Sequence, residues 1–121
     1  FLAAALSGKQ IKKFGDGSSR RDYTYIEDFT NGFIAAIDRT LGYEIFNLGN
    51  SATVSLNEAI ATIEKVSGCK LSIEQLPMQP GDVNLTNADI SKAKELLNYH
   101  PRTSFEEGMD IFCRWFRSSG L

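Results

Sequence analysis

The sequence predicts a small α/β fold in which about four helical segments alternate with short strands. One observation is that apolar residues recur at helical spacing in several stretches, each ended by Gly or followed by Pro. Another is that short apolar runs lie between these stretches, as is typical of strands. The 121 residues have an apolar fraction of 42%, so we expect one domain that spans residues 1–121.

One-sided apolar patterns predict two helices in the first third of the chain. Residues 1–6 are apolar and helix-favouring, and Ser7 and Gly8 stop the pattern. Because no capping residue precedes Phe1, we interpret this stretch as the last turns of a helix that begins in a longer protein. A full helix is predicted from Asp28 to Thr40. Its apolar face consists of Phe29, Phe33, Ile34 and Ile37.

Capping signals predict the remaining helices. Ser55 and Glu58 form a capping box, and Ser104 and Glu107 form a second one. A further helix, Asp89–Leu97, is expected to be capped by its first residue. Each of the two helices that begin with a capping box has a predicted inward face. It consists of Leu56, Ile60, Ile63 and Val66 in the first helix, and of Phe105, Met109, Phe112 and Phe116 in the second.

Three strands are predicted between the helices, at Ile11–Phe14, Tyr43–Leu48 and Lys70–Leu76. The second is closed by Gly49 and Asn50, which favour a turn. Residues 77–82 contain two prolines and a glycine, so they are predicted to form a loop.

The most informative stretch lies between residues 15 and 28. Gly15 and Gly17 favour a tight turn, and two arginines, Arg20 and Arg21, follow it. A pair of guanidinium groups suits a phosphate or a carboxylate, because each can donate to two oxygens at once. The alternative is that both arginines form weak surface ion pairs. The acidic partners available nearby in the sequence are Asp16, Asp22 and Glu27.

Charge, cysteine content and hydropathy argue against several classes of binding partner and site. The net charge of −2 does not favour nucleic-acid binding, although five cations gather between Lys9 and Arg21 against one acidic residue. Cys69 and Cys113 are far apart in sequence, which is not a metal-binding or redox spacing. Two reduced thiols are typical of a cytoplasmic protein. No apolar run approaches the length that spans a membrane, so we expect no membrane partner.

The residues alone predict no catalytic set. His100, the only histidine, precedes Pro101 in a loop, with no Ser or Cys nucleophile motif near it, so we expect it to flank a helix or face solvent rather than act as a general base. Asp82 follows Gly81, and the backbone freedom of that glycine would allow the Asp82 carboxylate to point at a ligand. An ordinary turn residue is the alternative interpretation of Asp82.

Several motifs, in order, resemble the nucleotide-sugar epimerases of the extended short-chain dehydrogenase/reductase family. They cover nearly the whole chain, and the closest branch is that of the UDP-glucuronate 4-epimerases. The segments that carry the resemblance are 8–17, Arg21–Asp28, Phe46–Asn50, Met78–Val83, Ala88–Ala93 and Tyr99–Thr103. The resemblance implies that the chain is the small C-terminal substrate-binding portion of such an enzyme, without its Rossmann half.

The resemblance also implies roles for individual residues. Arg21 matches an arginine that grips the nucleotide diphosphate, and Asp82 matches an acid that hydrogen-bonds the ribose. Lys12 and Phe14 match a segment that lies against the pyrimidine base. Gln79 stands where galactose-type relatives carry an arginine, so a second cationic contact to the diphosphate is not expected here.

The family's NAD chemistry requires motifs that this sequence lacks. No glycine-rich dinucleotide motif is present, and no tyrosine has a lysine four positions later. We therefore expect NAD to be the cofactor of a longer parent epimerase, while this chain binds a UDP-hexose or UDP-hexuronic acid without binding NAD or catalysing the reaction.

Three other interpretations of the same residues are open. Nucleotide-sugar dehydratases and decarboxylases of the family have similar C-terminal portions. Outside the family, the chain could be a non-catalytic nucleotide- or phosphate-binding module, or an interaction domain whose cations are solvated surface.

We also expect self-association. If the Rossmann half is missing, apolar surface that it would cover should be exposed. The residues expected to be uncovered are Phe1, Leu2 and Leu6, together with one edge of the strands.

Overall fold

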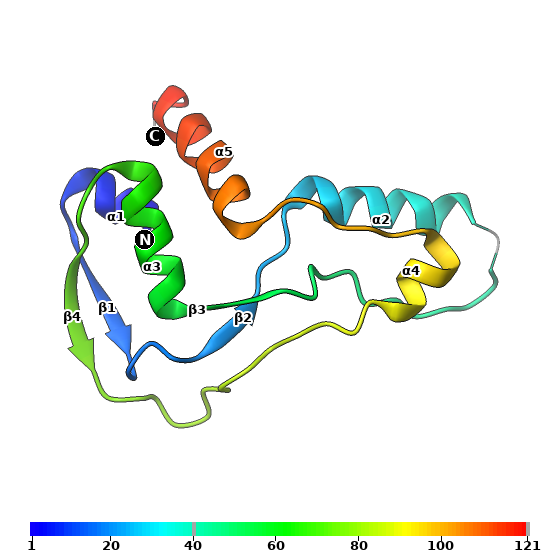
Figure 1. Cartoon of the computed structure of the whole chain (residues 1–121), viewed down its shortest axis with the longest axis horizontal. Helices are drawn as coiled ribbons and strands as arrows, with labels where there is room; N and C mark the ends of the chain where they lie inside the picture. Colours follow the sequence, from blue (N-terminus) through cyan, green and yellow to red (C-terminus); the bar gives the residue numbers. More distant parts are fainter. Residues whose placement is uncertain (40, 121) are drawn as a thin grey trace.

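The computed structural model describes residues 1–39 and 41–120 and confirms the α/β fold. These residues form five helices and four strands, arranged along the chain as shown in Figure 1. In order, they are α1 (Leu2–Ser7), β1 (Gln10–Phe14), β2 (Arg20–Asp22), α2 (Ile26–Asp38), β3 (Thr53–Ser55), α3 (Leu56–Ser67), β4 (Ser72–Leu76), α4 (Ser91–Leu97) and α5 (Phe105–Ser118).

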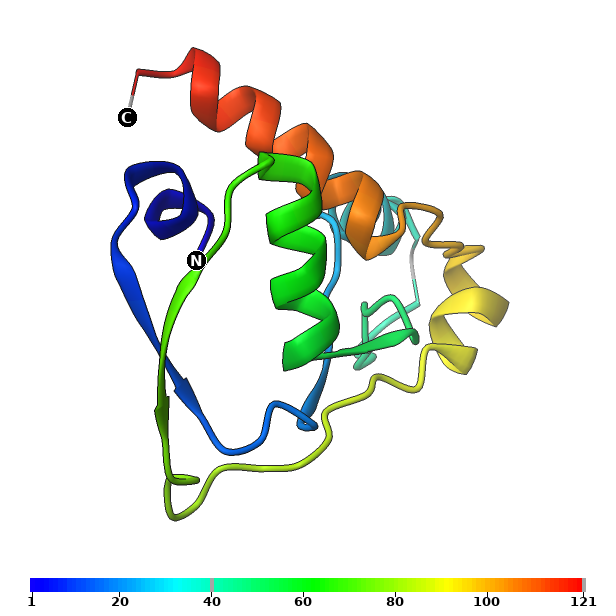
Figure 2. The same ribbon diagram turned by 60° about the vertical axis from the view of Figure 1, so that its left-hand side comes forward.

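The first lobe of the molecule consists of α1, α3, α5 and the parallel pair β1–β4, and it holds both termini (Figure 1). The strands pair in register from Gln10 opposite Ser72 to Phe14 opposite Leu76. Figure 2 shows α3 standing beside these strands, with α5 crossing it. The buried core between them consists of Leu2, Ala5, Ile11, Ile60, Ile63, Leu71 and Cys113.

The helix caps of the first lobe follow the sequence closely. The capping box at the start of α3 is complete, since Glu58 N–H donates to Ser55 Oγ and Ser55 N–H donates to Glu58 Oε2. At α5, Ser104 Oγ accepts from Glu107 N–H, which is one half of the predicted box. Gly8 and Gly68 end α1 and α3 in the left-handed conformation.

The second lobe consists of α2, α4 and the loop segments that pack on them, near residues 46–48, 88–90 and 99 (Figure 1). Its core is Ile90, Ala93, Leu97 and Tyr99. The Tyr99 hydroxyl donates to Gly49 O at 2.9 Å. Burial, and then the charges of Asp28 and Asp22, raise the pKa of this phenol. The second lobe is therefore built around one buried aromatic residue whose polar atom has a partner.

Helix α2 turns its small residues, not its large ones, toward this core. Ala35 and Ala36 pack against the cluster around Tyr99, and Gly32 is buried. A Cβ at Gly32 would lie 2.7 Å from the Tyr99 ring, so only glycine allows this approach. The large apolar residues of α2 are exposed by 41% to 67%. They are Ile26, Phe29, Phe33, Ile34 and Ile37, and we call them the α2 apolar surface.

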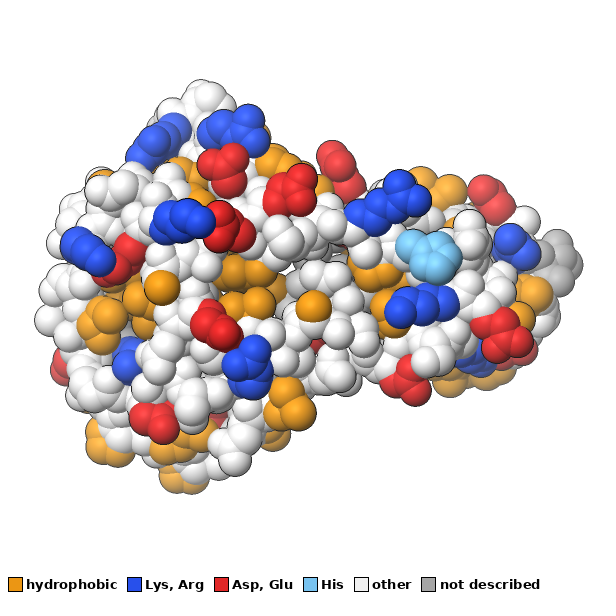
Figure 3. Space-filling model, in the orientation of Figure 1, with side chains coloured by type: hydrophobic (Ala, Val, Ile, Leu, Met, Phe, Trp, Pro, Cys, Tyr) orange, Lys and Arg blue, Asp and Glu red, His pale blue; other side chains and the backbone are white. Residues whose placement is uncertain are grey.

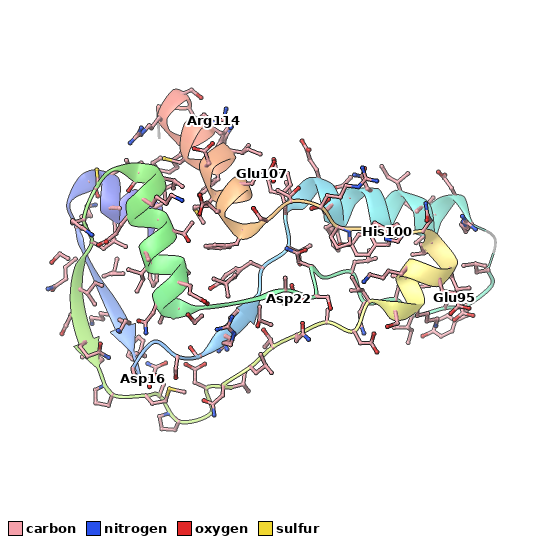
Figure 4. The ribbon with its side chains drawn as sticks, in the orientation of Figure 1. Asp16, Asp22, Glu95, His100, Glu107 and Arg114 are labelled. Atoms are coloured by element: carbon pink, nitrogen blue, oxygen red, sulfur yellow. The ribbon has the colours of Figure 1, made fainter. Side chains whose placement is uncertain are left out.

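Asp22 links the two lobes. Its carboxylate lies near the centre of the molecule (Figure 4) and accepts three backbone N–H groups. The donors are Asn50 at 2.9 Å, and Ser51 and Ala88 at 3.0 Å each. A Cβ at Gly49 would lie 2.7 Å from Asp22 Oδ2 and 2.4 Å from Ala88 Cβ, so this junction also requires glycine.

Several predicted details are wrong. Residues 43–48 do not form a strand, because no other described segment pairs with them. Helix α2 begins at Ile26, not Asp28, and Thr40 lies outside the described residues. Asp89 is not the N-cap of α4; that position is Ile90, while Asp89 Oδ1 accepts from Ser91 N–H.

The predicted inward face of α5 and the predicted uncovered residues each need a correction. Phe112 on α5 is 43% exposed, whereas Cys113 is buried in the core and Met109 and Phe116 pack against it. Leu2 is buried and Leu6 packs against the first-lobe core, so the expectation that they are uncovered is wrong. Phe1 is 47% exposed, as predicted.

Over residues 1–39 and 41–120, none of the helices combines the length and the apolar character needed to span a membrane.

Candidate functional site

All four binding residues suggested by the sequence line one hollow of about 180 Å³. Lys12 and Phe14 come from β1, Arg21 from β2, and Asp82 from the loop after β4. Because side chains alternate along a strand, Lys12 and Phe14 share one face of β1. The remaining lining residues are Phe1, Ser19, Tyr23 and Leu56.

Backbone pairing on both sides of β2 brings Arg21 and Asp82 together. On one side β2 pairs with β3 in antiparallel register, with Arg21 opposite Val54. On the other side, Arg20 N–H donates to Asn84 O at 2.8 Å, and Thr86 N–H donates to Arg20 O at 3.1 Å. The second pairing anchors the end of the loop that carries Asp82 beside β2, although that residue is 61 positions further along the chain.

Arg21 and Asp82 form an ion pair at the wall of the hollow. Nη2 of Arg21 lies 3.2 Å from Asp82 Oδ1, and Nη1 donates to Arg20 O at 2.9 Å. The two side chains are 28% and 39% exposed, so the pair is screened by water and contributes little stability by itself. A guanidinium held in this way presents a cation to the hollow, with a carboxylate acceptor beside it.

Arg20 does not join Arg21 in binding an anion, as a pair of guanidinium groups would. Its Nε donates to Thr53 Oγ1 at 2.9 Å, its Nη2 donates to Thr53 O at 2.6 Å, and its Nη1 lies 3.2 Å from Glu58. Neighbouring residues of a strand point to opposite faces, so Arg20 faces α3 while Arg21 faces the hollow. The surface ion-pair alternative is therefore correct for Arg20, with Glu58 as the partner in place of the acidic residues considered from the sequence.

The glycine turn that connects β1 to β2 is held by hydrogen bonds. Figure 4 shows Asp16 at the end of β1. The Ser18 hydroxyl and then its backbone N–H donate to Asp16 Oδ1, at 2.6 and 2.9 Å, and lower the pKa of that carboxyl. Gly17 adopts φ +85°, in the left-handed region that favours glycine.

The beginning of α3 closes one side of the site without offering an anion site. Leu56 N–H donates to Ser19 O and Asn57 N–H donates to Gly17 O, both at 3.0 Å, while Glu58 N–H is used in the capping box. The first three N–H groups of the helix are thus occupied. The anion-binding group of the hollow is Arg21, rather than a helix N-terminus.

The residues present do not fit a dinucleotide cofactor. A dinucleotide site needs a glycine-rich turn that leads from a strand into a helix N-terminus. Here the glycine turn leads from β1 into β2, and the nearest helix start, that of α3, has its N–H groups occupied.

Two other candidates from the sequence lie away from the hollow. His100 is exposed in the second lobe, as expected (Figure 4), with Nε2 3.1 Å from Asn98 Oδ1. Gln79 is exposed in the loop before Asp82, and its carbonyl accepts from Asp82 N–H at 3.2 Å. Positive and negative side chains are interspersed over the face shown in Figure 3.

Sequence reasoning missed the other lining residues. Tyr23 packs on Phe105 with ring centroids 4.8 Å apart, which fixes it at the rim of the hollow. Leu56 reaches the hollow only because its backbone is bonded to Ser19. Nothing in the local sequence indicates that α3 meets the glycine turn.

Comparison with known proteins identifies the family. The sequence pattern of the family described as GDP-mannose 4,6 dehydratase matches residues 1–112. The chain belongs to this family. Membership confirms the predicted resemblance to the extended short-chain dehydrogenase/reductase enzymes, and the chain corresponds to their C-terminal portion.

Three relatives illustrate what the chain is similar to. A UDP-glucuronate 4-epimerase of Thermodesulfobacterium geofontis is 46% identical over 120 residues, which is 98% of this chain and 37% of the relative. A UDP-N-acetyl-alpha-D-glucosaminuronate decarboxylase of Bacillus cytotoxicus is 32% identical over 97% of this chain and 38% of its own length. The crystal structure of a Bacillus cereus UDP-glucuronic acid 4-epimerase with UDP-glucuronic acid and NAD superimposes with a TM-score of 0.89 at 33% identity.

The superposition with the Bacillus cereus enzyme covers 98% of this chain and 38% of that structure. The chain therefore spans little more than a third of the length of the relatives it matches. The Bacillus cereus epimerase structure contains NAD, and this chain corresponds only to the C-terminal portion of such an enzyme.

Proposed function

We propose that this chain is the substrate-binding part of an NAD-dependent nucleotide-sugar epimerase, with UDP-glucuronate as the substrate of the whole enzyme. In this proposal Arg21 contacts the diphosphate, Asp82 accepts from the ribose hydroxyls, and Lys12 and Phe14 lie against the base. The observation that carries it is that these four residues, from three separate segments, line one hollow. The similarity to UDP-glucuronate 4-epimerases supports the choice of substrate.

The electrostatics of the hollow suit this ligand. A diphosphate needs a cation that can donate to two oxygens, and Arg21 supplies one. The ribose hydroxyls need an acceptor, and the Asp82 carboxylate lies 3.2 Å from that cation. When a nucleotide enters, the guanidinium can exchange part of its contact with Asp82 for the diphosphate, while the carboxylate accepts from the sugar.

The volume of the hollow implies that it holds only part of a nucleotide sugar. Small-molecule sites typically enclose about 300–1,000 Å³, whereas this hollow encloses about 180 Å³. We infer that the nucleotide half of the substrate lies here and that the sugar projects beyond the chain. NAD binding and hydride transfer then belong to the parent enzyme, and the chain alone is inactive.

A nucleotide-sugar decarboxylase or dehydratase is the second candidate for the whole protein. The family description and the similarity to the Bacillus cytotoxicus decarboxylase favour it. The same hollow would serve either reaction, because it contacts the nucleotide rather than the reacting sugar. A product assay on the longer protein with UDP-glucuronate distinguishes epimerisation from loss of carbon dioxide. We also propose that the protein is cytoplasmic, in keeping with its two unpaired cysteines.

Titration of the isotopically labelled chain with UDP, followed by NMR, tests the proposal. We expect saturable shifts at Lys12, Phe14, Arg21 and Asp82, and small or no shifts in α2 and α4. NAD should produce no saturable shifts, and UDP-glucuronate should bind without conversion to product. Shifts confined to the second lobe, or no shifts with UDP, would contradict the proposed site.

A further inference from the structure

We infer that Asn57, together with Lys13, is a positioning residue that sets the spacing between the two walls of the proposed nucleotide site. This inference rests on the proposed function. It concerns residues outside the hollow, since neither Asn57 nor Lys13 lines it. Both act on the glycine turn that connects the wall carrying Lys12 and Phe14 to the wall carrying Arg21.

The turn is clasped by side-chain contacts from two directions. Asn57 Nδ2 donates to Asp16 O at 3.1 Å, and Lys13 Nζ donates to the same carbonyl at 3.2 Å. Lys13 Nζ also donates to Asn57 Oδ1 at 3.1 Å, so each of the three residues Lys13, Asp16 and Asn57 is hydrogen-bonded to the other two. We call these three hydrogen bonds the Asn57 clasp. Through it, one side chain of α3 fixes the backbone of a turn that lies 41 residues earlier.

The close fit at Gly17 shows that the clasp has a defined geometry. Gly17 is buried, and a Cβ at this position would lie 2.1 Å from Asn57 Oδ1. The amide therefore occupies space that any other residue at 17 would need. Asn57 N–H also donates to Gly17 O at 3.0 Å, so both the backbone and the side chain of Asn57 hold the turn.

Position along the chain explains why the clasp matters for the ligand. Phe14 directly precedes the turn, and Arg21 is the second residue of β2, which follows it. A nucleotide must reach both walls, since its base lies at Lys12 and Phe14 and its diphosphate at Arg21. Inorganic pyrophosphate needs only Arg21. Loosening the turn should therefore weaken the binding of a nucleotide and leave the binding of pyrophosphate nearly unchanged.

Asn57→Ala is the variant that tests this inference. Position 57 is exposed in the first turn of α3, where Ala is a better helix former than Asn, so the helix itself should not be weakened. The variant loses the hydrogen bond from Asn57 Nδ2 to the turn and the one that Asn57 Oδ1 accepts from Lys13. This loss should weaken UDP binding about fivefold to tenfold, while the affinity for pyrophosphate stays within about twofold of wild type. Affinities are measured by NMR titration of the whole chain with each ligand.

Two further variants separate positioning from general damage. Asn57→Asp keeps an acceptor for Lys13 and loses the donor to Asp16 O, so we expect an intermediate loss of UDP affinity. Asn31→Ala makes the same Asn-to-Ala change at an exposed position of α2, outside the hollow, and should leave both affinities unchanged.

The outcomes distinguish this inference from the function on which it rests. If wild type binds neither UDP nor pyrophosphate, the proposed nucleotide site is wrong, and the positioning role falls with it. If wild type binds UDP but Asn57→Ala leaves the ratio of UDP to pyrophosphate affinity unchanged, only the positioning role is overturned. An equal loss for both ligands would likewise overturn it, because that would indicate damage to Arg21 as well.

Discussion

The two lobes bury their helices in opposite ways. In the first lobe, α1, α3 and β1 supply large apolar residues such as Leu2, Ile11 and Ile63 to a shared core. In the second lobe, α2 packs through Gly32, Ala35 and Ala36, and its large residues remain exposed. The first lobe therefore has a core of large residues from its own chain, whereas α2 in the second lobe presents a surface that is suited to a further partner.

The difference shows what an apolar pattern can and cannot predict. The spacing of Phe29, Phe33 and Ile37 predicts a helix, and the helix is present. It does not predict what covers that face, because the covering element need not belong to the same stretch of chain. The same reasoning applies to residues 43–48, where Tyr43 and Ile45 are 89% and 69% exposed. This stretch has the composition of a strand and no strand beside it among the described residues.

The largest expected effect concerns association through the α2 apolar surface. We propose that the isolated chain self-associates there, since burial of about 500 Å² of apolar area is worth on the order of 12 kcal/mol before ordering costs. The double substitution Phe33→Ser and Ile37→Ser should convert the associated species to monomer. Light scattering over a dilution series measures the change.

A matched variant tests whether the location matters. Trp115 on α5 is 52% exposed, similar to Phe33 at 52%, and lies outside the α2 apolar surface. Trp115→Ser should leave the association constant of the chain unchanged. A wild-type chain that is monomeric at every concentration would remove the proposed role of the α2 apolar surface.

A smaller effect, on the free energy of unfolding, is expected from substitution of Asp28, whose hydrogen bonds connect α2 to the segment before α5. Asp28 is 9% exposed, and its carboxylate accepts from Thr103 N–H at 2.9 Å and Arg102 N–H at 3.2 Å. Burial opposes ionisation, but these N–H groups outweigh it and lower the pKa of Asp28. Asp28→Asn should reduce the free energy of unfolding at pH 7 by about 1–2 kcal/mol.

The sign of the pH dependence follows from the lowered pKa. Because the folded state favours the ionised carboxylate, its stabilisation is present above the ordinary aspartate pKa of about 3.9 and is lost as the pH falls through the lower folded value. The difference between wild type and Asp28→Asn should therefore shrink below about pH 4. Thermal unfolding at neutral and acid pH measures it. A difference that is constant across this range would show that the carboxylate charge is not involved.

Local signals predicted most of the fold, and long-range contacts account for what they missed. Ser55 and Glu58 predicted the start of α3 because a capping box lies within one helical turn. The glycine turn and the strand before it were likewise visible locally. The roles of Arg20, Asp22 and Asn57 were not, because their partners, Thr53, Asn50 and Asp16, lie 28 to 41 residues away.

In the candidate site, too, local sequence signals and long-range contacts contribute differently. Arg21, Asp82, Lys12 and Phe14 were assigned from family motifs, and the structure brings them to one hollow. Composition and spacing alone left Arg21 and Asp82 with ordinary surface or turn alternatives. The pairing of β2 with residues 84–86 decides their proximity, and that pairing involves backbone atoms that carry no sequence signal.

The proposal that Arg21 binds the diphosphate is tested most directly by comparing UDP affinity after Arg21→Ala and after Arg20→Ala. The two arginines are adjacent, but only Arg21 lines the hollow, while Arg20 is bonded to Thr53 and Glu58. We predict that Arg21→Ala weakens UDP binding by roughly 2–4 kcal/mol and that Arg21→Lys recovers only part of the loss, since an ammonium cannot make the planar two-point contact. Arg20→Ala should lower the stability of the chain and change UDP affinity little. Equal UDP affinity in wild type and Arg21→Ala would contradict the assignment of this hollow as the diphosphate site.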